Sequence, residues 1–219
     1  MMKLINSTPS AFGRKVAIAL KEKRIAFEMV LDVPWNDQTI VPQHSPLQQL
    51  PILVTDSGEN VYDSMYICEW LERKHPSPPL LPADTDALLA ARRQQILAER
   101  LMEVIVLVVF EEQREQPSAA WMTRQRRKFE GGIAELSRLV GNRVPAVGDP
   151  ITYADIATAA ALTWFDFMLA NGLFAEVREA RWRAQYPNLV AYVDALESRP
   201  SFKETRPEMF VVDLPAVVH

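Results

Sequence analysis

"QLPILVTDSGENVYDSMYICEWL", residues 49–71, is the stretch that decides the fold. Pro51 begins one β-rich run, and an Asp-Ser-Gly-Glu turn at 56–59 separates it from a second, a pattern that predicts a β-hairpin. Ser64 then opens a segment whose apolar residues recur at helical spacing. The stretch therefore predicts two short strands followed at once by a helix.

The residues before this stretch extend the same pattern. Residues 3–6 form a short apolar strand candidate, and residues 10–23 have the spacing of an amphipathic helix. A second strand is expected at 26–33, and a loop rich in Pro, Gln and Asn follows through about Gln49. The predicted order is β-α-β-loop-β-β-α within roughly the first 75 residues.

The sequence pattern changes at "HPSPPLLPADTD", residues 75–86. This stretch has four prolines in twelve residues, which cannot continue a helix and indicate a connector. The periodic segments after it predict helices at 88–115, 119–140, 152–173 and 187–198, and residues 176–186 are expected to be helical as well. We therefore expect a small α/β domain at 1–78 and an all-helical domain at 87–219.

Composition excludes several classes of protein. The chain has 219 residues, 48% of them hydrophobic, and its 24 basic and 28 acidic residues give a net charge of −4, so no overall field favours nucleic acid or an anionic membrane. The longest apolar run, residues 104–110, is far shorter than the roughly 20 residues that span a bilayer. With one cysteine and three scattered histidines we expect neither a disulfide nor a metal site. No secretory signal is visible, so a cytoplasmic location is expected.

Ser10 stands where the first helix is expected to begin. A serine there commonly caps the helix by accepting a hydrogen bond from a backbone N–H of the first turn. Alternatively, its hydroxyl faces an anion such as a thiolate or a phosphate, which the positive end of a helix after a strand can hold. Ser7 and Thr8 are neighbouring hydroxyls and are the alternatives to Ser10 in this second interpretation.

Two further positions carry the same kind of ambiguity. Pro51 is either a simple strand start or the second residue of a cis Leu50–Pro51 bond that leaves the Leu50 backbone free to pair with an extended peptide. Asp63 and Ser64 either cap a helix or bind the ammonium and carboxylate groups of a zwitterion.

Taken together, these motifs resemble the cytosolic glutathione transferase superfamily. The resemblance rests on "SAFGRKVAIAL" (10–20), "QLPILV" (49–54), "VYDSMYICEWLE" (61–72), the proline-rich connector and the helical second half. It extends to "GDPITYADIATAAAL" (148–162), similar to the family's Ser/Thr-x-x-Asp box, in which Thr152 and Asp155 cap a core helix reciprocally. The resemblance implies a thioredoxin-like βαβ-ββα domain followed by an all-helical domain.

The resemblance also implies roles in binding glutathione, the co-substrate; no other cofactor is expected. Pro51 corresponds to the family's cis-proline, and the Leu50 backbone to the group that pairs with the cysteinyl portion. Asp63 and Ser64 match the pair that holds the γ-glutamyl end, while Gln49 stands where several classes contact the glycyl side.

Ser10 falls where serine-type, bacterial-like members place the hydroxyl that faces the sulfur. The chain has Ala11 where members with this pattern often have proline, which keeps both Ser10 and Ser7 as candidates. A cysteine at this position would favour disulfide exchange, whereas a serine cannot attack a disulfide. The single cysteine, Cys68, is expected to be an inert core residue.

The implied function is a glutathione transferase of the detoxification type that activates the thiolate for attack on a small apolar electrophile. By analogy the electrophile pocket draws on four aromatic residues, Phe12, Phe110, Trp164 and Phe165, and the protein is a homodimer without nucleic-acid or membrane partners. Two alternatives stay open: a non-catalytic glutathione- or ligand-binding module, and a glutathione-dependent reductase or isomerase.

Overall fold

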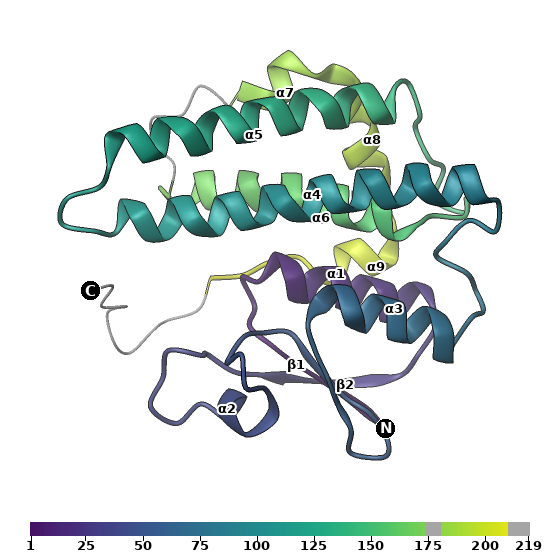
Figure 1. Cartoon of the computed structure of the whole chain (residues 1–219). Helices are drawn as coiled ribbons and strands as arrows, with labels where there is room; N and C mark the ends of the chain where they lie inside the picture. Colours follow the sequence, from purple (N-terminus) through teal and green to yellow (C-terminus); the bar gives the residue numbers. More distant parts are fainter. Residues whose placement is uncertain (174–180, 210–219) are drawn as a thin grey trace. The chain divides into compact units, whose positions relative to one another are not determined.

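The structure, a computed structural model, describes residues 1–173 and 181–209. These residues form two compact units, one made of 1–82 with 200–209 and the other of 83–173 with 181–199. The first unit is mixed α/β and the second is helical (Figure 1). Within the described residues, no helix combines the length and the apolarity that a membrane crossing requires.

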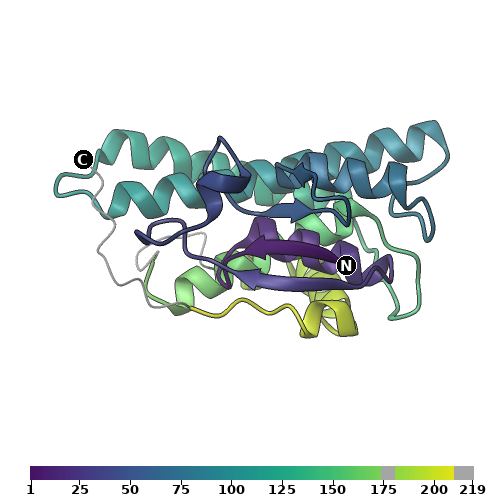
Figure 2. The ribbon, with the colours of Figure 1, turned by 90° about the horizontal axis from the view of Figure 1, so that it is seen from below.

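A four-stranded mixed sheet forms the centre of the first unit (Figure 2). Its strands, in the spatial order β2-β1-β3-β4, are β2 (Phe27–Leu31), β1 (Met2–Asn6), β3 (Ile52–Val54) and β4 (Asn60–Val61). The β1 and β2 strands run parallel and are joined by helix α1 (Ala11–Glu22), while β3 and β4 are the predicted antiparallel hairpin. The predicted β-α-β-loop-β-β-α order is confirmed.

Helices cover both faces of this sheet. Helices α1 and α3 (Ser64–Lys74) lie on one face, and α2 (Val41–His44) lies on the other (Figure 1). Under α2, Val41 packs with Ile5 and Ile52 in a buried apolar cluster. The sequence analysis predicted a loop where α2 lies. It missed this helix because four residues are too few to show a helical period in the sequence.

A short C-terminal helix, α9 (Pro200–Lys203), belongs to the first unit and packs on α1. Arg14, which is buried, donates from Nε to the carbonyl of Thr205 at 3.0 Å and from Nη2 to that of Phe202 at 3.1 Å. Lys21 forms an ion pair with Glu204 at 2.7 Å. Residues almost 200 positions apart in the sequence therefore complete the same unit, which the sequence analysis did not foresee.

The second unit consists of five helices in the described residues: α4 (Thr85–Glu112), α5 (Ala119–Val140), α6 (Tyr153–Ala170), α7 (Trp182–Gln185) and α8 (Pro187–Glu197). Helix α6 is buried along most of its length and packs on both α4 and α8. Helix α7 falls within the stretch 176–186 expected to be helical; residues 176–180 of that stretch lie outside the described residues.

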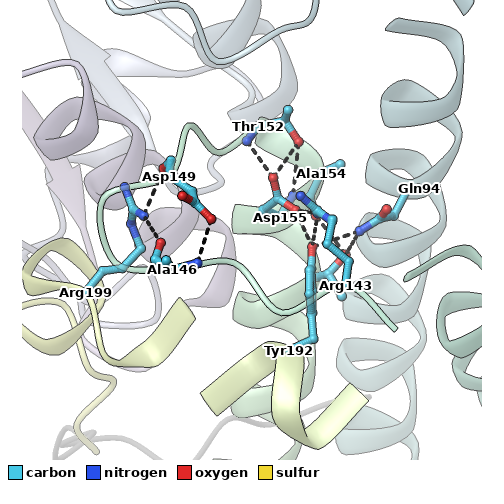
Figure 3. Close-up of polar contacts among 10 residues, drawn as sticks. Gln94, Arg143, Ala146, Asp149, Thr152, Ala154, Asp155, Tyr192 and Arg199 are labelled. Atoms are coloured by element: carbon cyan, nitrogen blue, oxygen red, sulfur yellow. Dashed lines mark hydrogen bonds and ion pairs between the residues drawn. The ribbon is translucent and has the colours of Figure 1, made fainter. Parts of the chain in front are cut away.

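The predicted capping box begins α6 (Figure 3). Thr152 Oγ1 accepts from the Asp155 N–H, and the Asp155 carboxylate accepts from the Thr152 N–H at 2.6 Å. The same carboxylate, fully buried, also accepts from Arg143 and from the Tyr192 hydroxyl of α8. The box is thus confirmed, and it forms part of a larger polar network that connects the start of α6 to α8.

Candidate functional site

The strand register brings the three candidate segments to one edge of the sheet. Because β1 and β3 are antiparallel with Ile5 opposite Ile52, the end of β1 lies beside the start of β3. Because Leu53 pairs with Val61, the end of β4 lies at the same edge. Three segments are therefore neighbours: the turn after β1, the residues before β3 and the start of α3. They lie together although Asn6 and Ser64 are far apart in the sequence.

Ser10 caps helix α1, as its position in the sequence predicts. Its Oγ accepts a hydrogen bond from the Gly13 N–H at 3.1 Å, and its carbonyl accepts from the Arg14 N–H at 2.9 Å. Ser10 is half-buried, whereas Ser7 is buried, and the Ser10 N–H donates to the Ser7 carbonyl at 3.1 Å. A hydroxyl has one donor and two acceptor sites, so the cap leaves the Ser10 proton available to an outside acceptor.

The residues before β3 form the second part of the edge. The Leu50–Pro51 peptide bond is cis. Pro51 is buried, Leu50 is half-buried and Gln49 is exposed. The residues preceding the strand thus remain accessible at the edge while the proline ring packs inside.

Asp63 and Ser64 form the third part. Asp63, not Ser64, is the N-cap of α3, and its Oδ1 accepts from the backbone N–H groups of Met65 at 2.9 Å and Tyr66 at 3.2 Å. Its side chain is exposed, and Oδ2 receives no hydrogen bond from the described part of the chain. Ser64 is the first residue of the helix and is buried. A carboxylate with one oxygen facing water therefore lies beside the positive end of a helix.

The four aromatic candidates fall in both units. Phe12 is half-buried in the first turns of α1, and Phe110 is half-buried near the end of α4. Trp164 and Phe165 are buried on α6. Phe165 contacts Phe129 of α5 with ring centroids 4.4 Å apart, and both rings line a small apolar cavity inside the helical unit.

Two residues that the sequence analysis did not single out lie at the same edge. Asn6 ends β1 with only 5% of its surface exposed, and its Oδ1 has no hydrogen-bond partner among the described residues. Gly13, in the first turn of α1, lies directly against the Asn6 side chain. A polar residue at the last position of β1, directly after the apolar Leu4 and Ile5, was the available signal.

Comparison with known families gives two matches along the chain. The model of the glutathione S-transferase N-terminal domain matches residues 4–79, and that of the glutathione S-transferase C-terminal domain matches residues 119–195. The chain belongs to the glutathione S-transferase family. The thioredoxin-like first domain and the all-helical second domain expected from the resemblance are confirmed for this family member.

Individual glutathione S-transferase relatives match over nearly the whole chain. The GST-like protein YibF of Escherichia coli K12 is 35% identical over 210 residues, which cover 94% of this chain and 98% of YibF. A glutathione S-transferase from Methylobacterium radiotolerans, solved in complex with glutathione sulfonate, is 46% identical with a TM-score of 0.86 and 99% coverage of both chains. Another from Methylobacillus flagellatus, solved with glutathione bound, is 33% identical with a TM-score of 0.84, covering 95% of this chain and all of that one.

Proposed function

We propose that this protein is a glutathione transferase that binds glutathione along the sheet edge and activates its thiol with Ser10. The observation that carries the proposal is the convergence of the Ser10, Leu50–Pro51 and Asp63–Ser64 segments at one edge. Support comes from relatives of 46% and 33% identity that hold glutathione sulfonate and glutathione.

In this proposal the peptide lies extended between the two helix starts. The γ-glutamyl ammonium pairs with the free Oδ2 of Asp63, and its carboxylate meets Ser64 at the N-terminus of α3. The Leu50 backbone pairs with the cysteinyl portion, and Gln49 lies beside the glycyl end. The cysteinyl sulfur then reaches the start of α1.

The geometry of Ser10 suits the thiolate. The Gly13 N–H bonds to Oγ and polarises the hydroxyl, which strengthens its own donation to a second partner. Lowering a thiol pKa from about 8.5 by about two units requires roughly 2.7 kcal/mol of preference for the thiolate. A hydrogen bond to a charged acceptor contributes roughly 1.5–3 kcal/mol, and a helix N-terminus adds about 0.3–1 kcal/mol. Helix capping and thiolate stabilisation are therefore compatible roles for one side chain.

The reaction that follows is nucleophilic attack on a small apolar electrophile. The sulfur lone pair forms the new S–C bond, and the electrophile either loses a halide or, for an enone, takes up a proton from water. That the aromatic residues Phe12, Phe110, Trp164 and Phe165 contact the electrophile stays a prediction from the resemblance. The homodimer, the cytoplasmic location, the detoxification role and the domain limits stay predictions.

The experiment is to measure glutathione binding by calorimetry and turnover on a panel of aryl halides, epoxides and enones, with the native chain and Ser10→Ala. The proposal expects micromolar-to-millimolar glutathione binding in both, and conjugation that falls at least tenfold in Ser10→Ala. Binding without turnover on any electrophile would instead favour the binding module. Rapid turnover of a glutathionyl disulfide, with little conjugation, would favour the reductase.

A further inference from the structure

The contact between Asn6 and Gly13 is the closest approach of a side chain to any glycine in the described part of the chain. A Cβ on Gly13 would lie 1.7 Å from Oδ1, 2.1 Å from Cγ and 2.4 Å from Nδ2 of Asn6. The flat carboxamide therefore lies against the Gly13 main chain in space that any other residue at position 13 would fill. Only glycine lets the end of β1 and the first turn of α1 come this close.

Burial of the Asn6 carboxamide at this position costs free energy. Asn6 is 95% buried (100 − 5), and its Oδ1 has no partner among the described residues, so the oxygen has lost its hydration without replacement. Buried polar groups of this kind are uncommon and call for an explanation. A branched apolar side chain would carry no such cost, but it is thicker than a planar amide and would push the first turn outward.

The contact between Asn6 and Gly13 fixes the position of the first turn of α1, which Ser10 caps. The Gly13 N–H is the donor to Ser10 Oγ, so the depth of Gly13 on the strand end sets the direction of that bond. Asn6 is itself anchored, because its carbonyl accepts from the Asp32 N–H at 2.9 Å. The contacts thus run from Asn6 to Gly13 to the Ser10 hydroxyl.

We propose that Asn6 is a positioning residue, which acts through Gly13 to aim the Ser10 hydroxyl at the sulfur of bound glutathione. The inference rests on the proposed function and adds to it the group that sets the hydroxyl's direction. Asn6 does not contact the sulfur in this scheme; its carboxamide acts as a spacer of defined thickness.

The test is a cycle of three variants, Asn6→Ala, Gly13→Ala and the double variant, in which the thiol pKa of bound glutathione is measured by thiolate ultraviolet absorbance. Gly13→Ala expels the carboxamide, and Asn6→Ala removes the spacer, so each single change raises the thiol pKa by about one unit, a tenfold loss in the thiolate-to-thiol ratio. In the double variant the methyl group introduced at position 13 occupies the vacated space, and the pKa returns toward that of the native protein.

Two glycines of α5 supply matched controls. Gly132→Ala places a Cβ 2.4 Å from Leu101 Cδ2 and destabilises the fold by a clash far from Ser10 in the sequence, whereas Gly131→Ala meets nothing within 4 Å. Both should leave the thiol pKa unchanged. A Gly13→Ala chain that does not fold leaves Asn6→Ala as the deciding variant.

Single variants with the native thiol pKa would overturn the inference, and so would a double variant that recovers stability but not the pKa. The two proposals fail differently. If Ser10→Ala raises the thiol pKa while the Asn6 and Gly13 variants do not, only the positioning role is lost. If the native protein itself leaves the thiol pKa at its free value, the proposed function is lost.

Discussion

Asp63 caps α3 and is also proposed to bind glutathione, and comparison with a second capping aspartate can separate the two roles. One oxygen caps α3 through the amides of Met65 and Tyr66, and the other is exposed and proposed to pair with the ammonium of glutathione. In the proposed function, one carboxylate would therefore serve both the helix N-terminus and the ligand. The same residue type caps α4, where Asp84 accepts from the Ala87 N–H at 2.9 Å.

We expect Asp63→Ala to lower the free energy of unfolding by about 0.5–2 kcal/mol, the usual cost of a lost cap. It should also raise the Kd for glutathione at least tenfold, because a charge-assisted hydrogen bond contributes roughly 1.5–3 kcal/mol. Asp84→Ala is the control, and should lose comparable stability with no change in Kd. Calorimetric titration of both variants checks this, and an equal Kd in the two would argue against an ammonium partner at Asp63.

At the scale of elements, most of the architecture was readable from the sequence. Strands and helices with several periods were predicted within a few residues, because burial of one face leaves a repeating pattern. Helix α2 was missed because four residues are too few to show a period. The loop before it is held by side-chain contacts, in which the Asp32 carboxylate accepts from Thr39 Oγ1 at 2.8 Å and the Ile40 N–H at 2.9 Å. Such non-repeating side-chain contacts leave no period.

The junction between α6 and α8 shows how a predicted box acquires unforeseen partners. The Thr152–Asp155 pair is visible in the sequence, but Arg143 and Tyr192 join it only in the folded chain. Burial raises the pKa of Tyr192 to about 12, against the opposing effects of the Arg143 charge and the hydrogen bond with Gln94. The neutral phenol is therefore the form that the helical unit requires.

This pKa predicts a loss of stability at high pH. Below pH 10 the tyrosine is protonated in both states; between pH 10 and about 12 it ionises in the unfolded chain while the folded chain keeps its proton, so unfolding is favoured as pH rises. Near neutral pH, Tyr192→Phe should cost about 1–3 kcal/mol through the lost hydrogen bonds. The difference between native and variant should shrink by about 2 kcal/mol between about pH 10 and 12.

Urea unfolding across this pH range measures the effect. Tyr186→Phe is the control, because Tyr186 stands at the start of α8 and takes no part in the hydrogen bonds among Gln94, Arg143, Asp155 and Tyr192. A difference between native and Tyr192→Phe that stays constant from about pH 8 to 12 would show that the phenol titrates normally.

At the scale of the whole molecule, the two compact units are not two consecutive stretches of the chain. Residues 200–209 follow the helical unit but belong with residues 1–82, held by Arg14, Lys21 and the buried Phe202. The domain limits predicted from the sequence, 1–78 and 87–219, follow the order of the chain, because no local pattern records that a helix returns to an earlier unit.

We predict that a chain ending at Arg199 is less stable than one ending at Met209. It loses the buried Phe202 ring, for which truncation typically costs about 3–5 kcal/mol, and it leaves the buried Arg14 guanidinium without the carbonyls of Phe202 and Thr205. Thermal unfolding of the two chains tests this, since both lack the same residues beyond 209. Equal midpoints would mean that α9 contributes nothing to the first unit.

Part of the candidate site was predicted from the sequence, and part of it was found only in the structure. Ser10, Pro51 and the Asp63–Ser64 pair were identified by local motifs, and the register of β1, β3 and β4 explains why they share one sheet edge. Asn6 and Gly13 were not singled out, because the polar end of β1 is a weak signal by itself and no motif encodes the close approach between that strand end and α1.

The central claim is that Ser10 stabilises a thiolate while it caps α1. The most direct measurement is a pH titration of bound glutathione, in which thiolate absorbance is followed in the native protein, Ser10→Ala and Ser7→Ala. We predict a thiol pKa about two units below the free value near 8.5 in the native protein and in Ser7→Ala, and a return toward the free value in Ser10→Ala. A native pKa equal to that of free glutathione, or a lowered pKa that survives Ser10→Ala, would contradict the account and leave Ser10 as a helix cap alone.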